Sequence, residues 1–361
     1  MKIVTIVGAR PQFIKAAAVS RPLRVQHQEI LVHTGQHYDE EMSDVFFEEL
    51  SIPTPDYHLN IGSGTHGAMT GRMLEAIENV LTDEKPDMVL VYGDTNSTLA
   101  GALAAAKLHI PVAHIEAGLR SFNKAMPEEQ NRVLTDHLSH TMFCPTATAV
   151  ENLKAEGITK RVHLVGDVMV DAVLFYIDLA RQRYTNIKNI ELVDLFSTKP
   201  IAPNVWQLAT IHRAENTDDA SKIKEILTAL EASDTPTIFP VHPRIKQAVQ
   251  ELNTKHSFKN ISFVKPVSYL PMLYLVAEAK RVITDSGGLQ KECYVLDTPC
   301  VTVRDQTEWV ETLVGGYNTL AKPEKQSLLT TINNAVIDAQ YNKMNFFGDG
   351  TAARRIISFL E

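Results

Sequence analysis

Short runs of β-branched and apolar residues alternate with longer segments of helical pattern along almost the whole chain. The runs KIVTIVG (residues 2–8), DMVLVYGD (87–94) and PVAHIEAG (111–118) belong to a first series. A second series begins at WQLATIHR (206–213) and includes RVITDSGG (281–288). Such alternation is typical of parallel strands joined by crossover helices. We therefore predict an α/β fold with two similar parallel sheets. The other predicted strands are EILVHTG, TMFCPT, VHLVGD, TIFPVHP, ISFVKP and PCVTVRD.

Two domains are also expected from the length, because 361 residues exceed the roughly 100–200 residues of one ordinary domain. Residues 183–204 separate the two series, since they mix polar residues with prolines and show no sustained strand pattern. We place the hinge just before this segment, near residues 168–175. The first domain is therefore expected at residues 1–170 and the second at 171–345.

The composition argues against several classes of protein. The formal net charge is −8 at pH 7 and the pI is about 5.9, whereas binding to nucleic acid needs a basic face. The first apolar run has about five residues before Gly8, too short for a signal peptide or a membrane span. Cys144, Cys293 and Cys300 show no C-x-x-C spacing, so neither a metal site nor a disulfide framework is expected. We expect a cytoplasmic protein that binds neither nucleic acid nor membranes.

Polar side chains follow the predicted strands at their carboxyl ends, where open α/β sheets bind ligands. Asp94 follows VLVYG, Glu116 follows VAHI, His212 follows LATI, His242 follows FPV and Ser286 follows VITD. Each position has an ordinary structural explanation, since an Asp often caps a helix and a His at a strand end often has a structural hydrogen bond. The number of such positions nevertheless predicts a ligand site.

Two stretches have the composition of an anion site. SGG at residues 286–288 turns after a strand and precedes a helix, whose first N–H groups and dipole attract phosphate. GARPQFIK adds Arg10 and Lys15 after the first strand, with Pro11 suited to a first helical position. An ordinary strand–turn–helix corner and a solvated helix start explain the same residues. Neither stretch contains G-x-G-x-x-G or G-x-x-x-x-G-K-[ST], and we expect neither a dinucleotide cofactor nor a Walker-type nucleotide site in this chain.

The order of the motifs identifies a family that the chain resembles. The motifs are VGARPQFIK, TGQHYDEEM, VYGDTNSTLAG, HIEAGLRS, MPEEQNR, GDVMVDA, TIHRAEN, VHPR, TDSGGLQKE and RDQTEW. Each is modest alone, but together they cover nearly the whole chain in the expected order. On these residues the chain resembles the UDP-N-acetylglucosamine 2-epimerase family of the non-hydrolysing bacterial type.

The resemblance implies an architecture of two Rossmann-like domains that face each other across a central cleft, as in glycosyltransferases of the B type. The last helix of the family crosses back to the first domain, and GDGTAARRIISFL is similar to that helix, so residues 346–361 are assigned to it. The resemblance also implies a cytoplasmic homodimer that acts on a UDP-sugar for cell-surface polysaccharide synthesis. It implies no cofactor.

Roles for individual residues follow from the same resemblance. Arg10 and Lys15 are implied to lie near the diphosphate, and Ser286 with Gly287 and Gly288 around the same phosphates. Glu292 is implied to bind the ribose hydroxyls. The substrate-binding set also contains His242 and Trp309. The implied catalytic residues are Asp94, Glu116, Glu128 and His212.

The implied reaction is an elimination followed by an addition. A base removes the C2 proton while UDP leaves C1, and UDP adds back after protonation from the other face. We assign Asp94 and Glu116 to proton transfer at C2, Glu128 to assistance or to the second face, and His212 to the departing phosphate. Carboxylates with pKa values tuned by burial and by each other suit this task. The residues do not decide which carboxylate acts on which face.

Several alternatives stay open at this point. SFNKAM between Glu116 and Glu128 is shorter than the loop of most UDP-N-acetylglucosamine epimerases, and Trp309 in TEWVE stands where those enzymes hold an arginine. Both features resemble the branch that acts on UDP-2,3-diacetamido-2,3-dideoxyglucuronate. A hydrolysing epimerase that releases free sugar, a UDP-sugar glycosyltransferase and a catalytically silent UDP-sugar sensor share the expected nucleotide site.

Overall fold

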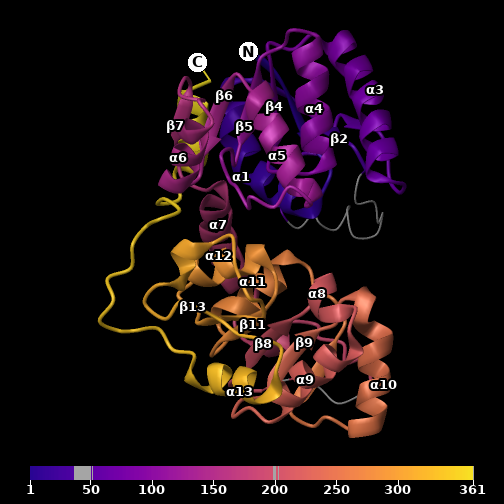
Figure 1. Ribbon diagram of the computed structural model, residues 1–361, viewed down its shortest axis with the longest axis vertical. Coiled ribbons are helices and arrows are strands. Elements are labelled where there is room, and N and C mark those ends of the chain that lie inside the picture. Colours follow the sequence, from indigo (N-terminus) through magenta and orange to yellow (C-terminus); the bar gives the residue numbers. More distant parts are fainter. Residues whose placement is uncertain (36–49, 51, 198–200, 202, 361) are drawn as a thin grey trace. The chain divides into compact units, whose positions relative to one another are not determined.

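The chain forms two compact units (Figure 1). Met1–Ala172 and Asn345–Glu361 make up the first unit, and Val173–Met344 make up the second. The division falls inside helix α7 (Val168–Arg183). The computed structural model describes residues 1–35, 50, 52–197, 201 and 203–360.

The first unit contains a seven-stranded parallel sheet in the order β3-β2-β1-β4-β5-β6-β7. Its central strands are buried on both faces, which explains why they read as continuous apolar runs. The strands are β1 (Lys2–Val7), β2 (Gln28–His33), β3 (Tyr57–His58), β4 (Met88–Tyr92), β5 (Val112–Ile115), β6 (Thr141–Cys144) and β7 (Val162–Leu164). The helices are α1 (Arg10–Gln26), α3 (His66–Glu84), α4 (Asn96–Lys107), α5 (Pro127–Leu138), α6 (Ala147–Ala155) and α14 (Ala352–Ser358).

The second unit repeats this architecture with a six-stranded parallel sheet in the order β10-β9-β8-β11-β12-β13. The strands are β8 (Gln207–Thr210), β9 (Thr237–Pro240), β10 (Ile261–Val264), β11 (Val282–Thr284), β12 (Cys300–Thr302) and β13 (Asn318–Leu320). The helices are α8 (Ala214–Thr217), α9 (Ala220–Glu231), α10 (Lys246–His256), α11 (Tyr269–Ala277), α12 (Gly287–Val295) and α13 (Lys325–Asn334). Short 3-10 helices occur at Ile187–Asn189, Pro243–Ile245 and Val310–Leu313.

Each sheet has one point where the strand order reverses. The chain builds outward from β1 to β3 and then returns to the other side of β1 with β4. It does the same from β8 to β10 before β11 pairs with β8. In open α/β sheets, ligands bind beside the carboxyl ends of the strands at such a reversal. The ends of β1 and β4, and those of β8 and β11, are therefore the places to look for a site.

Apolar cores fix these strand ends. In the first unit α3 and α4 pack together, and Met73 and Ile77 of α3 contribute to one core with Val4 and Val91 of the sheet. In the second unit the apolar face of α9 joins the core of the sheet. Among the described residues no helix combines the length and hydrophobicity that a membrane crossing requires.

The end of the chain packs within the first unit. The N–H groups of Ala352 and Ala353, at the start of α14, donate to the Asp171 carboxylate at 3.1 and 2.9 Å. Just beyond α14, the ring of Phe359 stacks on His163 of β7 with the centroids 4.0 Å apart. These contacts tie residues beyond 345 to the end of β7 and the start of α7.

Candidate active site

Two charged side chains meet at the reversal point of the first sheet. Lys15 projects from α1, Glu116 directly follows β5, and the two form an ion pair in which the side chains are 10% and 9% exposed. Gly93 follows β4 with φ +62°, and a Cβ there would lie 3.1 Å from Glu116 Oε2. The glycine thus lets the end of β4 pass close to the carboxylate, in a backbone conformation that other residues rarely adopt.

Asp94, the next residue, forms an ion pair with Arg132 of α5. Burial raises the pKa of Asp94, the positive charge of Arg132 opposes this rise, and the nearby Glu116 carboxylate adds to it. Asn131, beside Arg132, donates to the Asp94 carbonyl at 2.9 Å. Two carboxylates with different cationic partners therefore lie near each other at the ends of adjacent strands.

The two adjacent acids in the first turn of α5 have different surroundings. Glu129 is buried and accepts hydrogen bonds from the N–H groups of Ser121 and Phe122, both at 2.9 Å. Glu128 is exposed, and within the described residues it has neither a hydrogen bond nor an ion pair. Glu129 thus orders the loop before α5, while the Glu128 carboxylate is available for a ligand.

In the second unit a buried carboxylate supports His212 at the reversal point between β8 and β11. Asp285 is fully buried and accepts hydrogen bonds from the His212 and Arg213 N–H groups and from the Asn216 amide, all at 3.0–3.1 Å. His212 Nδ1 lies 3.3 Å from Asp285 Oδ1, and the imidazole is 39% exposed. The carboxylate therefore orients a histidine whose ring reaches solvent.

His242, after β9, stacks on His212 with the ring centroids 5.6 Å apart. Burial lowers the pKa of His242, and the charges of His212 and Arg244 lower it further. A neutral His242 suits a place beside a second imidazole, since two adjacent cations would repel each other.

The start of α12, predicted from sequence to bind phosphate, has charged side chains beside it. Ser286 is the residue before the helix and its side chain does not cap it. Glu308 lies beside Gly287, because a Cβ on Gly287 would be 2.3 Å from Glu308 Oε1. Burial would raise the pKa of Glu308, but the charges of Arg304 and Arg213 outweigh it and the pKa is lowered. Their guanidinium nitrogens lie 2.7 and 3.5 Å from the carboxylate.

Two predicted binding residues in this region are largely buried. Glu292, in α12, and Trp309, after β12, are each 6% exposed. The Lys291 ammonium lies over the Trp309 indole, 3.9 Å from its centroid, in a cation–π contact. Trp309 thus presents one face to a buried cation.

The pattern of the whole chain decides the family. The profile described as UDP-N-acetylglucosamine 2-epimerase matches residues 23–361. The chain belongs to the UDP-N-acetylglucosamine 2-epimerase family. A UDP-N-acetylglucosamine 2-epimerase homolog of Methanococcus maripaludis is 50% identical to it, with 100% of this chain and 99% of the relative covered. The UDP-2,3-diacetamido-2,3-dideoxy-D-glucuronate 2-epimerase of Pseudomonas aeruginosa is 48% identical over the same shares.

The fold agrees with solved structures of the family. The UDP-GlcNAc 2-epimerase of Methanocaldococcus jannaschii, in complex with UDP-GlcNAc and UDP, superposes with a TM-score of 0.87 at 44% identity and covers 100% of this chain and 99% of its own. The predicted class of two Rossmann-like domains with parallel sheets is confirmed.

Most of the site residues predicted from sequence fall into two groups. Lys15, Asp94, Glu116 and Glu128 lie at the end of the first sheet, whereas His212, His242, the SGG turn, Glu292 and Trp309 lie in the second unit. The side chain of Arg10 lies outside the described part of the chain. Among the described residues no group of His, Cys, Asp and Glu side chains could hold a metal ion.

Sequence reasoning missed several residues that contact the predicted ones. They are Arg132, Asp285, Arg304 and Glu308, with Arg213 beside His212. They stand inside motifs that were recognised for other residues, so their position within a motif was the sequence signal that could have found them.

Sequence reasoning also overlooked one candidate phosphate-binding motif. GSGTHG at residues 62–67 has the spacing G-x-G-x-x-G. A dinucleotide site requires this motif after a central strand of the sheet. Here it follows β3, an edge strand of two residues. Arg72 of α3 donates to the Ser63 carbonyl at 2.6 Å across this loop.

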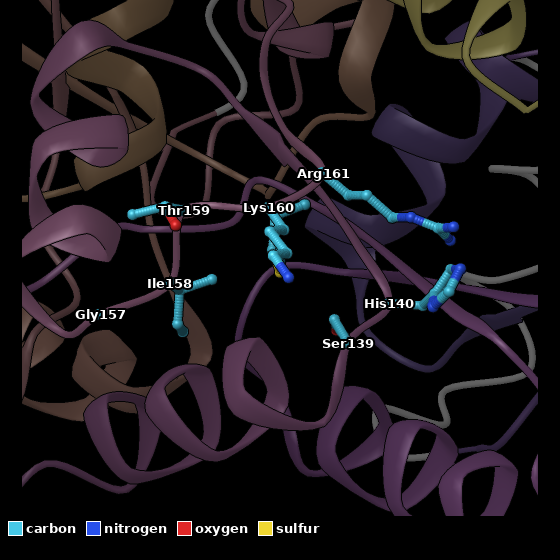
Figure 2. A pocket seen from close by; sticks show the side chains of 8 residues that line it. Ser139, His140, Gly157, Ile158, Thr159, Lys160 and Arg161 are labelled. Atoms are coloured by element: carbon cyan, nitrogen blue, oxygen red, sulfur yellow. The ribbon is translucent and has the colours of Figure 1, made fainter.

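A separate depression of about 470 Å³ lies at the opposite edge of the first sheet (Figure 2). Its walls come from Ser139 and His140 before β6 and from residues 157–161 before β7. Burial lowers the pKa of His140, and the charge of Arg161 lowers it further. Since these residues stand at the amino ends of the strands, the depression belongs to the edge away from the candidate acids.

Proposed function

We propose that this protein interconverts the C2 epimers of a UDP-N-acetylhexosamine, UDP-N-acetylglucosamine and UDP-N-acetylmannosamine, without hydrolysing them. Family membership and the names of the relatives support the reaction. The observation that carries the proposal is the pair of acids Asp94 and Glu116, which leave adjacent strands and have separate cationic partners.

The proposed chemistry has two steps. A base takes the C2 proton, the C2–H electrons form a C1=C2 double bond, and the C1–O bond breaks with its electrons leaving on UDP. The intermediate is a glycal. An acid then protonates C2 on the other face while a UDP oxygen forms a new bond to C1. Both steps need UDP to stay bound and need groups that exchange protons near neutral pH.

The surroundings of the acids suit such proton exchange. Burial raises the pKa of Asp94, so its carboxyl group takes up a proton more readily than an ordinary aspartate. Glu116 is paired with Lys15 instead of Arg132 and thus has a different environment, as acid–base pairs require. We assign both acids to C2 and give the exposed Glu128 an assisting role or the second face.

The nucleotide is proposed to bind at the second sheet. The N–H groups at the start of α12, with Ser286, Gly287 and Gly288, receive the diphosphate, and Glu292 accepts from the ribose. His212, oriented by Asp285, stabilises the departing phosphate, and His242 lies beside it. Arg10 and Lys15 keep the diphosphate role that the resemblance gives them.

Incubation with UDP-N-acetylglucosamine in deuterated water tests the proposal. We expect deuterium at C2 of both epimers and an intact bond to UDP. A product that keeps its original C2 hydrogen would contradict proton abstraction, and free N-acetylmannosamine with UDP would indicate a hydrolysing enzyme. An Asp94→Asn variant that exchanges C2 hydrogen at the native rate would remove Asp94 from the mechanism.

A second substrate is favoured by one specific observation. Trp309 stands where the resemblance expects an arginine, and a relative at 48% identity is a UDP-2,3-diacetamido-2,3-dideoxy-D-glucuronate 2-epimerase. The diacetamido sugar would undergo the same chemistry at C2, since the reacting atoms are alike. Comparing kcat/KM for the two UDP-sugars distinguishes these substrates.

A further inference from the structure

His114 is a buried histidine of β5 that none of the roles above uses. Its side chain is fully buried, with Nδ1 2.7 Å from Asp136 Oδ1 and Nε2 2.7 Å from the Gly93 carbonyl oxygen. A neutral imidazole has one donor nitrogen and one acceptor nitrogen, whereas both neighbours here are acceptors. A hydrogen on each ring nitrogen satisfies both contacts, so the ring can join Asp136 to the Gly93 carbonyl.

The partner carboxylate is held as an anion. Burial alone would raise the pKa of Asp136, but its hydrogen bond with His114 and the charges of His114 and Arg120 outweigh burial and lower it. Asp136 Oδ2 also accepts from the Gly118 N–H at 3.1 Å and from Arg120 at 2.7 Å. One carboxylate of α5 thus binds residues 114 and 118, on either side of Glu116.

The residue between these two anchors has an unusual backbone. Glu116 has φ +71°, a left-handed conformation that is strained for a non-glycine residue and persists only where its surroundings enforce it. The N–H groups of Glu116 and Ala117 both donate to the Phe143 carbonyl at 3.1 Å. Asp136 completes this support from the other side and so fixes the direction in which the Glu116 side chain leaves the strand.

The same imidazole ring also fixes the neighbouring strand end. The carbonyl that it binds belongs to Gly93, directly before Asp94, and Asn131 of α5 binds the carbonyl of Asp94 itself at 2.9 Å. His114 therefore links the end of β4 to the end of β5. Asp94 follows Gly93, whose carbonyl His114 contacts, and Glu116 stands two residues before Gly118, whose N–H donates to Asp136.

We propose that His114 and Asp136 are a positioning pair for the reaction, which hold the backbone of both proton-transfer acids without touching the substrate. This inference rests on the proposed function. Loss of either partner frees the ends of β4 and β5, and displacement of a catalytic group by about 1 Å can cost roughly 100-fold in rate. UDP binding, which is assigned to the second sheet, stays intact.

Two variants of the full-length protein test the pair. His114→Gln cannot donate in both directions, and Asp136→Asn loses the charge and one of the two oxygens that serve His114 and Gly118. We expect kcat and C2 deuterium exchange to fall together by about 10- to 100-fold, with the KM for the UDP-sugar and the Kd for UDP within about twofold of native. Glu156→Gln is the matched control, because Glu156 binds Nε and Nη2 of Arg120, whereas Asp136 binds Nη1. It should keep native kcat.

The outcomes separate the inference from the function on which it rests. A native enzyme that exchanges no C2 hydrogen contradicts the proposed function. If the native enzyme exchanges C2 hydrogen and the folded His114→Gln and Asp136→Asn variants keep native kcat, the positioning pair is contradicted. It is also contradicted if Glu156→Gln loses as much kcat as they do. Should the variants not fold, the 15N NMR signals of His114 in the native protein decide, since the pair needs a hydrogen on Nδ1 for Asp136 and one on Nε2 for Gly93. A ring nitrogen that lacks its hydrogen overturns the inference.

Discussion

Lys15 and Glu116 form an ion pair in which both side chains are about nine-tenths buried. We predict that Lys15→Met lowers the free energy of unfolding by about 3 kcal/mol, since breaking a buried pair leaves one charge without its partner. Its kcat should fall as well, because Glu116 loses the cation that holds its carboxylate. Urea unfolding and steady-state kinetics measure the two effects.

The double variant Lys15→Met/Glu116→Gln separates stability from catalysis in this pair. It removes both charges, so most of the lost stability should return, whereas activity should stay low because the Glu116 carboxylate is gone. If Lys15→Met alone is as stable as native, the pair contributes nothing to holding Glu116.

Arg132 is predicted to set the pH range in which Asp94 works. Its charge opposes the rise that burial causes in the pKa of Asp94, so Arg132→Met should raise that pKa further. Asp94 accepts a proton only when ionised, and activity is therefore lost as the pH falls through its pKa. The acid limb of kcat/KM should move to higher pH.

Arg132→Lys serves as the control for this shift, since it keeps the positive charge and should move the limb less. Full pH profiles of the three enzymes give the comparison. An acid limb that stays at its native pH in Arg132→Met would show that another group controls it.

The fold was largely predictable because most of its strands are buried on two faces. All eleven predicted strands occur, and all but the partly exposed edge strand Val162–Leu164 are buried over most of their length. The two missed strands, Tyr57–His58 and Asn318–Leu320, stand at sheet edges and have only two and three residues. Neither belongs to a longer apolar run of the kind that predicted the other short strands.

The candidate site was predictable only where residues follow strands. Asp285 binds the backbone of His212 across 73 positions of sequence, and this contact exists because β8 and β11 are neighbours in the sheet. His114 likewise reads as part of an apolar strand, and its partner Asp136 is identified only once α5 is placed. Roles that depend on a distant partner could not be read from local patterns.

Gly287 is predicted to be essential for UDP binding. An alanine there would place its Cβ 2.3 Å from Glu308 Oε1, so the end of the Glu308 side chain must shift at the start of α12. A displaced negative charge beside the proposed phosphate site should raise the Kd for UDP at least about tenfold. Isothermal titration calorimetry measures this.

Gly71→Ala is a suitable control for Gly287→Ala. A Cβ at Gly71, in α3, meets nothing within 4 Å, so UDP affinity should stay native while stability rises by up to about 1 kcal/mol. Native UDP affinity in Gly287→Ala would place the diphosphate elsewhere.

Trp309 is predicted to act together with Lys291. The Lys291 ammonium lies 3.9 Å from the indole centroid, and both side chains are nearly fully buried. Trp309→Arg would set a guanidinium against this ammonium in place of an attractive aromatic face, and two like charges at that depth repel each other strongly. The single variant should therefore unfold at lower urea concentration than the native protein.

The double variant Trp309→Arg/Lys291→Glu converts the repulsion into an ion pair and should recover much of the lost stability. It also restores the arginine that the family resemblance expects at this position, so we predict that its kcat/KM for UDP-N-acetylglucosamine rises relative to that for the UDP-diacetamido-glucuronate. Lys291→Glu alone is the control, because it removes the cation–π contact without adding an arginine. The ratio of kcat/KM for the two substrates, measured in all four enzymes, tests the role of Trp309. If the ratio is the same in every folded variant, the Trp309 position does not select the sugar, and substrate choice must come from residues around Asp94 and Glu116.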